Sequence, residues 1–225
     1  MIDKDLSYYL KNSILVWNKL SIDEQGELVQ SSALNCYQKG ENLHGRESGC
    51  IGTMFVITGQ LRVYILSDEG KEITLYRLYA NDSCVLSASC VLANINFDVI
   101  IDAEVNSEVL MINSAVVSQV MKRNIYFECY IYKLTTERFS DVMWAMQQIL
   151  FRSIDERLAA CLWDASLHNA DSVITVTHET LAKDIGSARE VVSRMLKYFE
   201  NEGIVKLSRK GITITDKRKL RMLIK

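Results

Sequence analysis

The stretch of sequence that decides the fold reads Thr177-His-Glu-Thr-Leu-Ala-Lys-Asp-Ile-Gly-Ser-Ala-Arg-Glu-Val-Val-Ser-Arg-Met-Leu196. We expect a first helix over residues 178–184, because Leu181 and Ile185 are apolar and lie one helical turn apart. Gly186 then supplies a sharp bend, because glycine adopts backbone conformations that are costly for other residues. The stretch therefore predicts a helix-turn-helix.

The second helix of this pair is predicted to begin at Ser187, which forms a capping box with Glu190 three residues later. The residues that suit its buried side are Val191, Val192, Met195, Leu196 and Phe199. The opposite side carries, at intervals of three and four residues, Arg189, Glu190, Ser193, Arg194 and Lys197. Arginine can form two hydrogen bonds with guanine, and glutamate can accept one from cytosine. We interpret this helix as a DNA recognition helix; the alternative is an amphipathic helix with a solvated charged face.

A short basic hairpin follows the recognition helix, which is expected to end at Gly203. Residues 204–207 and 211–215 are predicted to form two strands. The tip between them, Ser208-Arg-Lys210, carries two cations that can contact the phosphate backbone of DNA. The sequence thus predicts a winged helix-turn-helix. Its candidate DNA contacts are Thr177, His178, Ser187, Arg189, Glu190, Ser193, Arg194, Lys197, Arg209 and Lys210.

The net charge of −2 conceals an asymmetry along the 225 residues. Residues 151–225 contain 14 Lys and Arg against 10 Asp and Glu, whereas residues 1–150 contain 12 against 18. The basic part is therefore the part that holds the predicted helix-turn-helix, as attraction to phosphate requires. The length allows two modest domains.

The sequence also bears on the compartment. No stretch approaches the roughly 18 uninterrupted apolar residues of a transmembrane helix, and Met1-Ile-Asp-Lys-Asp5 lacks the basic region of a signal peptide. We therefore expect a cytoplasmic protein with no membrane partner, whose six cysteines are mostly reduced.

Short apolar runs broken by Gly, Asn and Asp dominate the first half of the chain. Before them, residues 1–20 predict a short amphipathic helix, and Ser21 with Glu24 forms a capping box for a second helix that reaches about Ser32. The candidate strands are 53–58, 60–67, 72–78, 84–88, 99–104 and 108–112. Asp68-Glu-Gly-Lys71 is a hairpin turn between two of them. This spacing is typical of an all-β sandwich or barrel.

A long helix is predicted after these strands. Following a helix from Asn113 or Ser114 to about Arg123, a second helical segment extends over residues 125–151. Its apolar seam, with alternating spacings of four and three residues, consists of Thr135, Phe139, Val142, Met146 and Ile149. Such a seam is typical of a two-stranded coiled coil, so we interpret it as a dimer interface. A helix buried in the core of one chain is the alternative.

This order of parts resembles the CRP/FNR superfamily of bacterial transcription regulators. The most specific parts of the resemblance are Gly59-Gln-Leu-Arg-Val-Tyr-Ile-Leu-Ser-Asp-Glu-Gly-Lys-Glu-Ile73, Glu156-Arg-Leu-Ala159 and Ile185-Gly-Ser-Ala-Arg-Glu-Val-Val-Ser-Arg194. The resemblance implies an α+β fold. Its parts are a β-roll sensor, like the jelly roll of cyclic-nucleotide-binding domains, with N-terminal helices (1–124), a dimerisation helix (125–151) and a winged helix-turn-helix (152–225).

The resemblance also implies a function and roles for single residues. Arg189, Glu190 and Arg194 match the base-reading positions of the cyclic-AMP receptor branch, and Glu190, Ser193 and Arg194 match those of the FNR branch. We therefore expect a homodimeric transcription regulator, not an enzyme, that binds an inverted-repeat operator in double-stranded DNA. RNA polymerase is a candidate further partner.

The sensor region departs from the cyclic-AMP binders of the superfamily. Those proteins carry a Gly-Glu pair in a phosphate cassette and, roughly ten residues later, an arginine that neutralises the cyclic phosphate. The corresponding segment here is Asn81-Asp-Ser-Cys-Val-Leu-Ser-Ala-Ser-Cys90, followed by residues 94–101, with neither feature. A buried phosphate without a cation is poorly compensated. We expect no cyclic-AMP binding, and the effector is not identified by the sequence.

Other cofactors and metals are not expected either. An iron–sulfur cluster needs four thiolates, usually closely spaced, but no Cys-x₂-Cys pair occurs among Cys36, Cys50, Cys84, Cys90, Cys129 and Cys161. A haem needs an axial ligand, and the three histidines have other expected places. His178 belongs to the helix-turn-helix, His168 to a helix end, and His44 to a Gly-bounded turn at the surface.

Cys84 and Cys90 flank Val-Leu-Ser-Ala-Ser in the segment where the relatives hold their effector. A thiol–disulfide pair could lock this loop in response to a redox signal. The alternative is that both are small buried residues, as free cysteines commonly are.

Two other functional classes fit the sequence less well. A cupin-like β-barrel enzyme needs two or three histidines and a carboxylate, but His44 is the only histidine in residues 1–112, and no P-loop, Gly-x-Ser-x-Gly or His-Glu-x-x-His motif occurs. A scaffold dimer would not need Arg189, Glu190 and Arg194 on one helix face.

Overall fold

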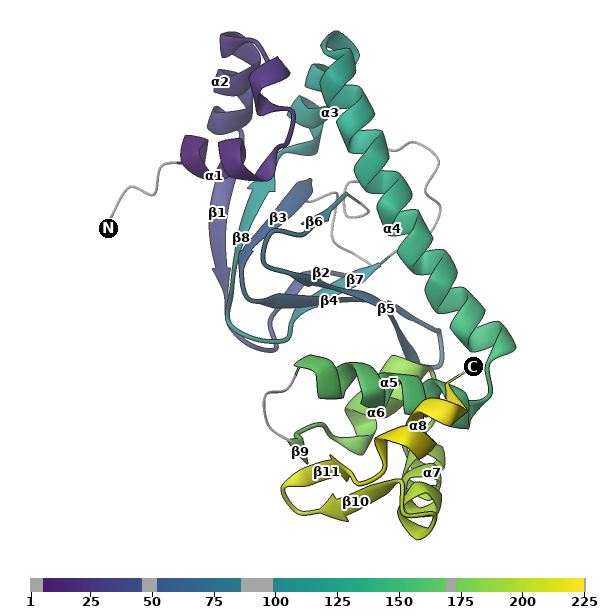
Figure 1. The fold of residues 1–225 in the computed structure, drawn as a ribbon. Helices are drawn as coiled ribbons and strands as arrows, with labels where there is room; N and C mark the ends of the chain where they lie inside the picture. Colours follow the sequence, from purple (N-terminus) through teal and green to yellow (C-terminus); the bar gives the residue numbers. More distant parts are fainter. Residues whose placement is uncertain (1–5, 46–51, 86–98, 169–172, 225) are drawn as a thin grey trace. The chain divides into compact units, whose positions relative to one another are not determined.

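A computed structural model describes residues 6–45, 52–85, 99–168 and 173–224 of the chain. The chain forms two compact units. The first unit comprises residues 1–65 and 75–143, and the second comprises residues 66–74 and 144–225. The elements of both are labelled in Figure 1.

Two four-stranded sheets form the centre of the first unit (Figure 1). One has the order β1 (Ser32–Tyr37), β8 (Ser107–Ile112), β3 (Thr53–Thr58) and β6 (Ser83–Cys84). The other has the order β2 (Asn42–His44), β7 (Ile100–Ala103), β4 (Gln60–Leu66) and β5 (Glu72–Tyr79). Pairing is antiparallel between β1 and β8, β3 and β8, and β4 and β7.

Five of the predicted strands match β3, β4, β5, β7 and β8 to within one or two residues. The sixth was predicted over 84–88, but β6 is Ser83–Cys84, and residues 86–88 lie outside the described residues. β1 and β2 were not predicted. The prediction that His44 lies in a surface turn is wrong, because His44 is buried at the end of β2.

Gly59 shows why the β3–β4 connection requires a glycine. Its φ is +96°, a conformation that other residues rarely adopt. A Cβ atom there would lie 2.2 Å from the Ser107 Oγ and 2.7 Å from the Asn106 carbonyl oxygen. The turn can therefore pack against the start of β8 only without a side chain.

Helices cover part of the first unit and share its core. They are α1 (Leu6–Ser13), the 3₁₀ helix η1 (Trp17–Lys19), α2 (Ile22–Gln30), α3 (Ser114–Arg123) and α4 (Ile125–Phe151), whose last turns belong to the second unit. The predicted capping box at the start of α2 is confirmed: Ser21 Oγ accepts from Glu24 N at 3.2 Å, and Glu24 Oε2 accepts from Ser21 N at 2.8 Å. Phe127 and Ile131 anchor α4 in the core.

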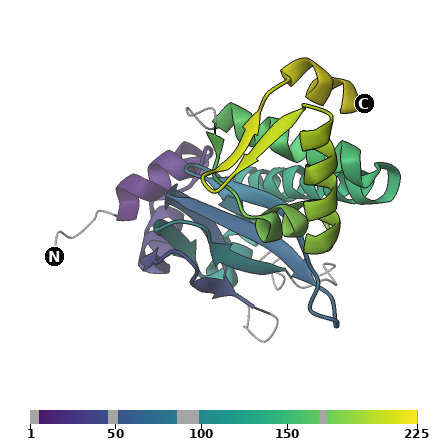
Figure 2. The ribbon, with the colours of Figure 1, turned by 90° about the horizontal axis from the view of Figure 1, so that it is seen from below.

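The second unit has a core of its own (Figure 2, green to yellow). It contains α5 (Ile154–His168), β9 (Val173–Ile174), α6 (His178–Ile185), α7 (Arg189–Asn201), β10 (Val205–Ser208), β11 (Gly211–Ile214) and α8 (Lys217–Leu223). The strands form one sheet in the order β10-β11-β9. β9 and α8 were not predicted; α8 packs against α5 through the fully buried Leu220.

Residues 66–74 also belong to the second unit and contact the C-terminal half of α6. Lys183 Nζ donates to Glu72 Oε1 at 2.9 Å, and Thr74 Oγ1 donates to Asp184 Oδ1 at 3.0 Å. The predicted turn is confirmed at the tip, where Ser67 N donates to the Lys71 carbonyl oxygen at 2.9 Å.

No helix within the described ranges has both the length and the apolarity that a membrane span needs.

Candidate nucleic-acid interface

α6 begins where the sequence predicted it, and Thr177 is its N-cap. The Thr177 Oγ1 accepts a hydrogen bond from Thr180 N at 3.0 Å, which satisfies one of the free N–H groups of the first turn. Thr177 itself is exposed. The other free N–H groups at this helix start can therefore donate to an anion from outside.

The turn between α6 and α7 is built on Gly186, as predicted. Gly186 is left-handed, with φ 63° and ψ 45°, and its N–H donates to the Ala182 carbonyl oxygen. Arg157 of α5 supplies a second partner for this helix end, because its Nη1 donates to the Ile185 carbonyl oxygen. Burial lowers the pKa of Arg157 below its ordinary value. A partly buried guanidinium thus holds the turn from inside.

The predicted start of α7 is wrong by one residue. Ser187 was expected to cap the helix with Glu190, but the N-cap is Ala188, which makes no side-chain capping hydrogen bond. The physical reason is that the turn includes Ser187, whose N–H donates to the Ala182 carbonyl oxygen at 2.9 Å. The Ala188 carbonyl oxygen accepts from Val191 N and Val192 N instead.

The two faces of α7 separate as the helical spacing predicted. Val192, Leu196 and Phe199 are fully buried, whereas Val191 and Met195 are half-buried. The exposed side chains on the other face are Arg189, Glu190, Arg194, Lys197 and Tyr198, and the half-buried Ser193 lies among them. The exposed face of α7 is therefore a charged row, which contains both positively and negatively charged side chains.

His178 and Ser193 join the two helices of the motif. The His178 Nδ1 and the Ser193 Oγ are 2.8 Å apart, and both residues are half-buried. Two candidate DNA contacts that were predicted independently, one on each helix, are thus hydrogen-bonded to each other.

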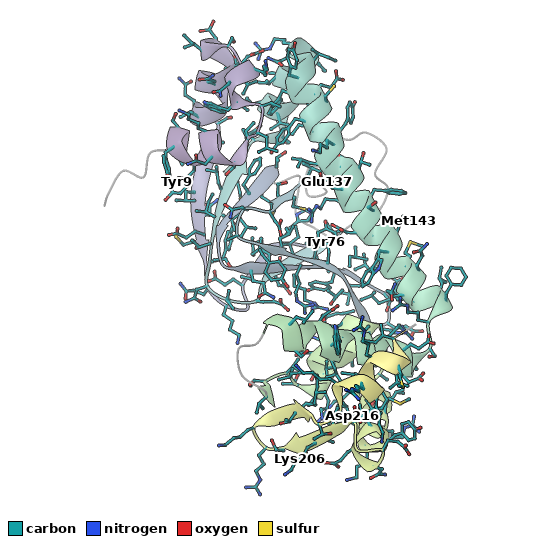
Figure 3. All side chains as sticks on the ribbon, viewed as in Figure 1. Tyr9, Tyr76, Glu137, Met143, Lys206 and Asp216 are labelled. Atoms are coloured by element: carbon teal, nitrogen blue, oxygen red, sulfur yellow. The ribbon has the colours of Figure 1, made fainter. Side chains whose placement is uncertain are left out.

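The wing is confirmed as a hairpin of β10 and β11 with Arg209 and Lys210 exposed at its tip. Figure 3 shows Lys206 at the outer edge of this hairpin. A pocket of about 300 Å³ lies between the wing and the start of α6. Its lining includes Thr177, His178, Arg209 and Lys210. Two cations and a helix start therefore converge on one hollow.

Glu200 connects α7 to the wing. Its Oε2 accepts from Lys197 Nζ at 2.7 Å, and its Oε1 accepts from Leu207 N of β10 at 3.0 Å. The hydrogen bond from Lys197 lowers the pKa of Glu200. Lys197, predicted to contact phosphate, is thus exposed but already paired with a carboxylate.

The comparison with known proteins agrees with this geometry. The family model of the Crp-like helix-turn-helix domain matches residues 156–223. A crystal structure from Eubacterium rectale, assigned to the CRP/FNR family of transcriptional regulators, is 41% identical over 95% of this chain and 99% of that chain, with a TM-score of 0.90. The chain belongs to the CRP/FNR family.

More distant CRP/FNR structures share the fold. The CLP protein of Xanthomonas campestris, described as a c-di-GMP responsive global regulator, is 18% identical over 87% of this chain and all of that chain, with a TM-score of 0.71. FixK2 of Bradyrhizobium japonicum is 16% identical over 86% of this chain and 98% of that chain, with a TM-score of 0.66. No curated protein matched the sequence. The family consists of transcription regulators, so the enzyme alternative is set aside.

In the first unit of this CRP/FNR protein, Cys84 is fully buried and its Sγ lies 3.7 Å from the Tyr76 Oη. Burial raises the pKa of Tyr76 well above its ordinary value. The Arg138 guanidinium of α4 lies 5.3 Å from the centre of the Tyr76 ring and pairs with Asp141 at 3.0 Å. Figure 3 shows Tyr76 on the side of the sheet toward α4. Cys90 lies outside the described residues.

The predicted seam of α4 is only partly exposed. Phe139 and Met146 are 60% and 45% exposed, whereas Thr135, Val142 and Ile149 are half-buried. The apolar side chains that share the exposed row are Tyr132, Phe139, Met143, Met146 and Leu150. This row keeps the heptad spacing but is rotated slightly from the predicted seam.

Sequence reasoning missed Arg138 and Arg157. Arg138 Nε and Arg157 Nε are buried without a hydrogen-bond partner in the described part of the chain. Arginine on an amphipathic helix is normally read as a surface residue, so no local signal distinguished these two. Among the described residues, no group of three or more His, Cys, Asp or Glu side chains is placed to bind a metal ion.

Proposed function

We propose that this regulator binds an inverted-repeat operator in double-stranded DNA as a homodimer, with α7 of each copy in the major groove. The observation that carries the proposal is the charged row of α7, whose opposite face is fixed in the core. A helix held in this way can present Arg189, Glu190 and Arg194 to base edges without losing its packing.

The candidate contacts divide into two groups by chemistry. Arg189 and Arg194 are assigned to guanine, Glu190 to the amino group of cytosine, and Ser193, whose hydroxyl can donate or accept, to a base edge. Phosphate contacts are assigned to the residues around the pocket and at the helix ends: Thr177, His178, Ser187, Lys197, Arg209 and Lys210. Lys197 already donates to Glu200, whose negative charge offsets part of the attraction to phosphate, so the net contribution of Lys197 is expected to be the smallest of the cations.

The proposed dimer forms along α4. An exposed row of large apolar side chains at heptad spacing is rare on a monomeric protein and typical of a helix that pairs with another. Two-fold symmetry then presents two identical recognition helices, about 34 Å apart for successive major grooves on one side of the duplex. The proposed location is the cytoplasm, with RNA polymerase as a further proposed partner.

The proposed signal acts on the first unit and changes the population of the DNA-binding arrangement. We propose that it is not cyclic AMP, because the chain lacks the Gly-Glu pair and the arginine of the cyclic-AMP binders. Resident haem, metal and iron–sulfur cofactors are likewise not part of the proposal. The thiol of Cys84, beside the Tyr76 phenol, is the proposed point for a redox signal together with Cys90.

Selection from random duplexes, followed by gel shifts, tests the proposal. Wild type should return a two-fold symmetric motif and shift a duplex containing it as one discrete complex. Arg189→Ala should return altered weights at one G·C pair in each half-site. Recovery of no motif by wild type, or the same base weights from wild type and Arg189→Ala, contradicts the assignment. Reduced and diamide-treated protein compared with Cys84→Ser tests the redox part separately.

A further inference from the structure

The hydrogen bond between His178 and Ser193 joins the side chains of the two helices of the helix-turn-helix. His178 is the first residue of α6, and Ser193 is on the second turn of α7, between the exposed Glu190 and Lys197. Their side-chain atoms Nδ1 and Oγ are 2.8 Å apart. Ser193 is therefore a candidate base contact whose hydroxyl already has one partner inside the protein.

We propose that His178 is a positioning residue, which decides whether Ser193 acts toward a DNA base as a hydrogen-bond acceptor or as a donor. The proposal rests on the proposed function, because Ser193 can read a base only if α7 enters the major groove. It adds a second task, acting through Ser193, to the phosphate contact proposed for His178.

The chemistry follows from the two states of the imidazole ring. A neutral ring with its hydrogen on Nε2 accepts at Nδ1, so the Ser193 hydroxyl donates to it and offers only lone pairs outward. Ser193 then accepts from the amino group of cytosine or adenine. An imidazolium ring donates from Nδ1 instead. The Ser193 hydrogen is then free to donate to guanine or to the O4 atom of thymine.

The pocket beside the wing favours one neutral tautomer. His178 lines this pocket together with Arg209 and Lys210, which can hold a phosphate of the DNA backbone. A phosphate there can accept from the Nε2–H of His178, and that hydrogen bond leaves Nδ1 as the acceptor. The contact of Nε2 with the DNA backbone then sets the role of Nδ1 toward Ser193, because the hydrogen bond of one imidazole nitrogen decides the protonation of the other.

The elements that meet at His178 or line the pocket it shares, α6, α7 and the wing, carry charges of both signs. On its own helix Glu179 is adjacent. Arg209 and Lys210 of the wing line the same pocket as His178. The charged residues of α7, the helix that carries Ser193, are Arg189, Glu190, Arg194, Lys197 and Glu200. Arg157 and Glu72 lie at the opposite end of α6. Protonation of the His178 ring would change the complex from the acceptor to the donor form of Ser193, because Nδ1 would then donate to the hydroxyl.

A purely structural role would give a different result. If His178 only braces α6 against α7, its loss lowers stability and weakens binding to every sequence alike. The base preference at the Ser193 position would not then depend on pH. The base preference measured at two pH values therefore separates the two roles.

The experiment compares base preference at about pH 8 and about pH 6, on either side of the histidine range. Wild type, His178→Asn, Ser193→Ala and the double variant are each selected on random duplexes, and affinities for the resulting sites are measured by fluorescence anisotropy. Asparagine places an amide near the position of Nδ1 but does not titrate. His168→Asn, which changes the histidine at the end of α5, is the matched control.

Wild type and His168→Asn should prefer an amino-bearing base at one position of each half-site by about 5-fold at the higher pH, the worth of one hydrogen bond. This preference should be lost or reversed at the lower pH. His178→Asn should keep one preference at both pH values. Ser193→Ala and the double variant should show none at either.

A pH-dependent preference that persists in His178→Asn, or in Ser193→Ala, overturns the proposal. So does a wild-type motif that is specific but unchanged between the two pH values, a result that needs no variant to fold. If wild type selects no motif at either pH, the proposed operator binding fails instead, and this outcome differs from both.

Discussion

α4 and α7 are both amphipathic helices, but they leave opposite kinds of side chain exposed. α7 buries its apolar side in the second unit and exposes a charged row. α4 is anchored by Phe127 and Ile131, yet it exposes Phe139 and Met146 at heptad spacing. The apolar side of α7 is thus covered within one chain, whereas α4 leaves apolar side chains exposed, and this row is where we propose that a second copy packs.

The largest expected effect is the loss of the proposed dimer along α4. Phe139→Glu with Met146→Glu introduces two carboxylates into the exposed row, and pairing with a second copy would then bury unpaired charge. We expect the dimer to dissociate at least about 100-fold more readily, from a loss of several kcal/mol. Light scattering over a concentration series measures this directly. Both side chains are exposed in the single chain, so the variant should still fold.

Lys133→Glu is the control, because Lys133 is an exposed polar position of α4 outside the apolar row. It should leave the assembly unchanged. A wild-type protein that is monomeric at micromolar concentration would show that the exposed row of α4 serves some other partner.

The next effect concerns the α7 side. Arg194→Ala should weaken operator binding by about 1–3 kcal/mol and relax the preference at one G·C pair in each half-site. Arg218→Ala, which removes an exposed arginine of α8, should change affinity little and the motif not at all. Equal losses of affinity for the two variants would mean that positive charge on this unit contributes to binding wherever it lies, and that Arg194 has no specific contact with a base.

A third prediction concerns the stability of the protein and the turn between α6 and α7. Gly186→Ala should destabilise the protein by about 1–2 kcal/mol, because an alanine in the left-handed region is strained. A Cβ atom there would meet only ordinary contacts, the nearest at 3.6 Å. The opposite sign is expected for Gly26→Ala in the middle of α2, where a Cβ atom meets nothing within 4 Å and alanine favours the helix. Denaturant unfolding of both variants tests the pair, and a loss in both would refute the conformational argument.

The smallest expected effect lies in the wing. Arg209→Ala should weaken binding to all sequences alike and reduce the slope of log affinity against log salt by about 0.9, as for one phosphate contact. The selected motif should stay the same. A changed motif would place Arg209 among the base-reading residues and shift the reading surface from α7 toward the wing.

Much of the fold could be predicted because its signals are local. Gly186, the Ser21–Glu24 box and the periodicity of α4 and α7 each act within a few residues. β9 and α8 are different. β9 has two residues and exists because it pairs with β11, and α8 is fixed by the burial of Leu220 against a distant core. Neither reason can be seen in a short window of sequence.

The candidate site divides in the same way. The exposed row of α7 follows from helical spacing alone. The start of α7 could not be placed from the sequence. Ser187 and Glu190 have the spacing of a capping box, but Ser187 belongs to the turn and the N-cap is the next residue, Ala188. The His178–Ser193 hydrogen bond and the Tyr76–Cys84 contact join residues on separate elements. Such contacts depend on how the elements pack against each other, so the spacing of residues along the sequence cannot predict them.

Glu200 has a mechanical consequence. Glu200 lies on α7, and its Oε1 accepts from the Leu207 amide of β10, so one carboxylate ties the recognition helix to the wing. In the proposed DNA complex, the contacts of the helix and those of the wing should therefore form and break together. A state in which the helix contacts DNA and the wing does not should then be disfavoured.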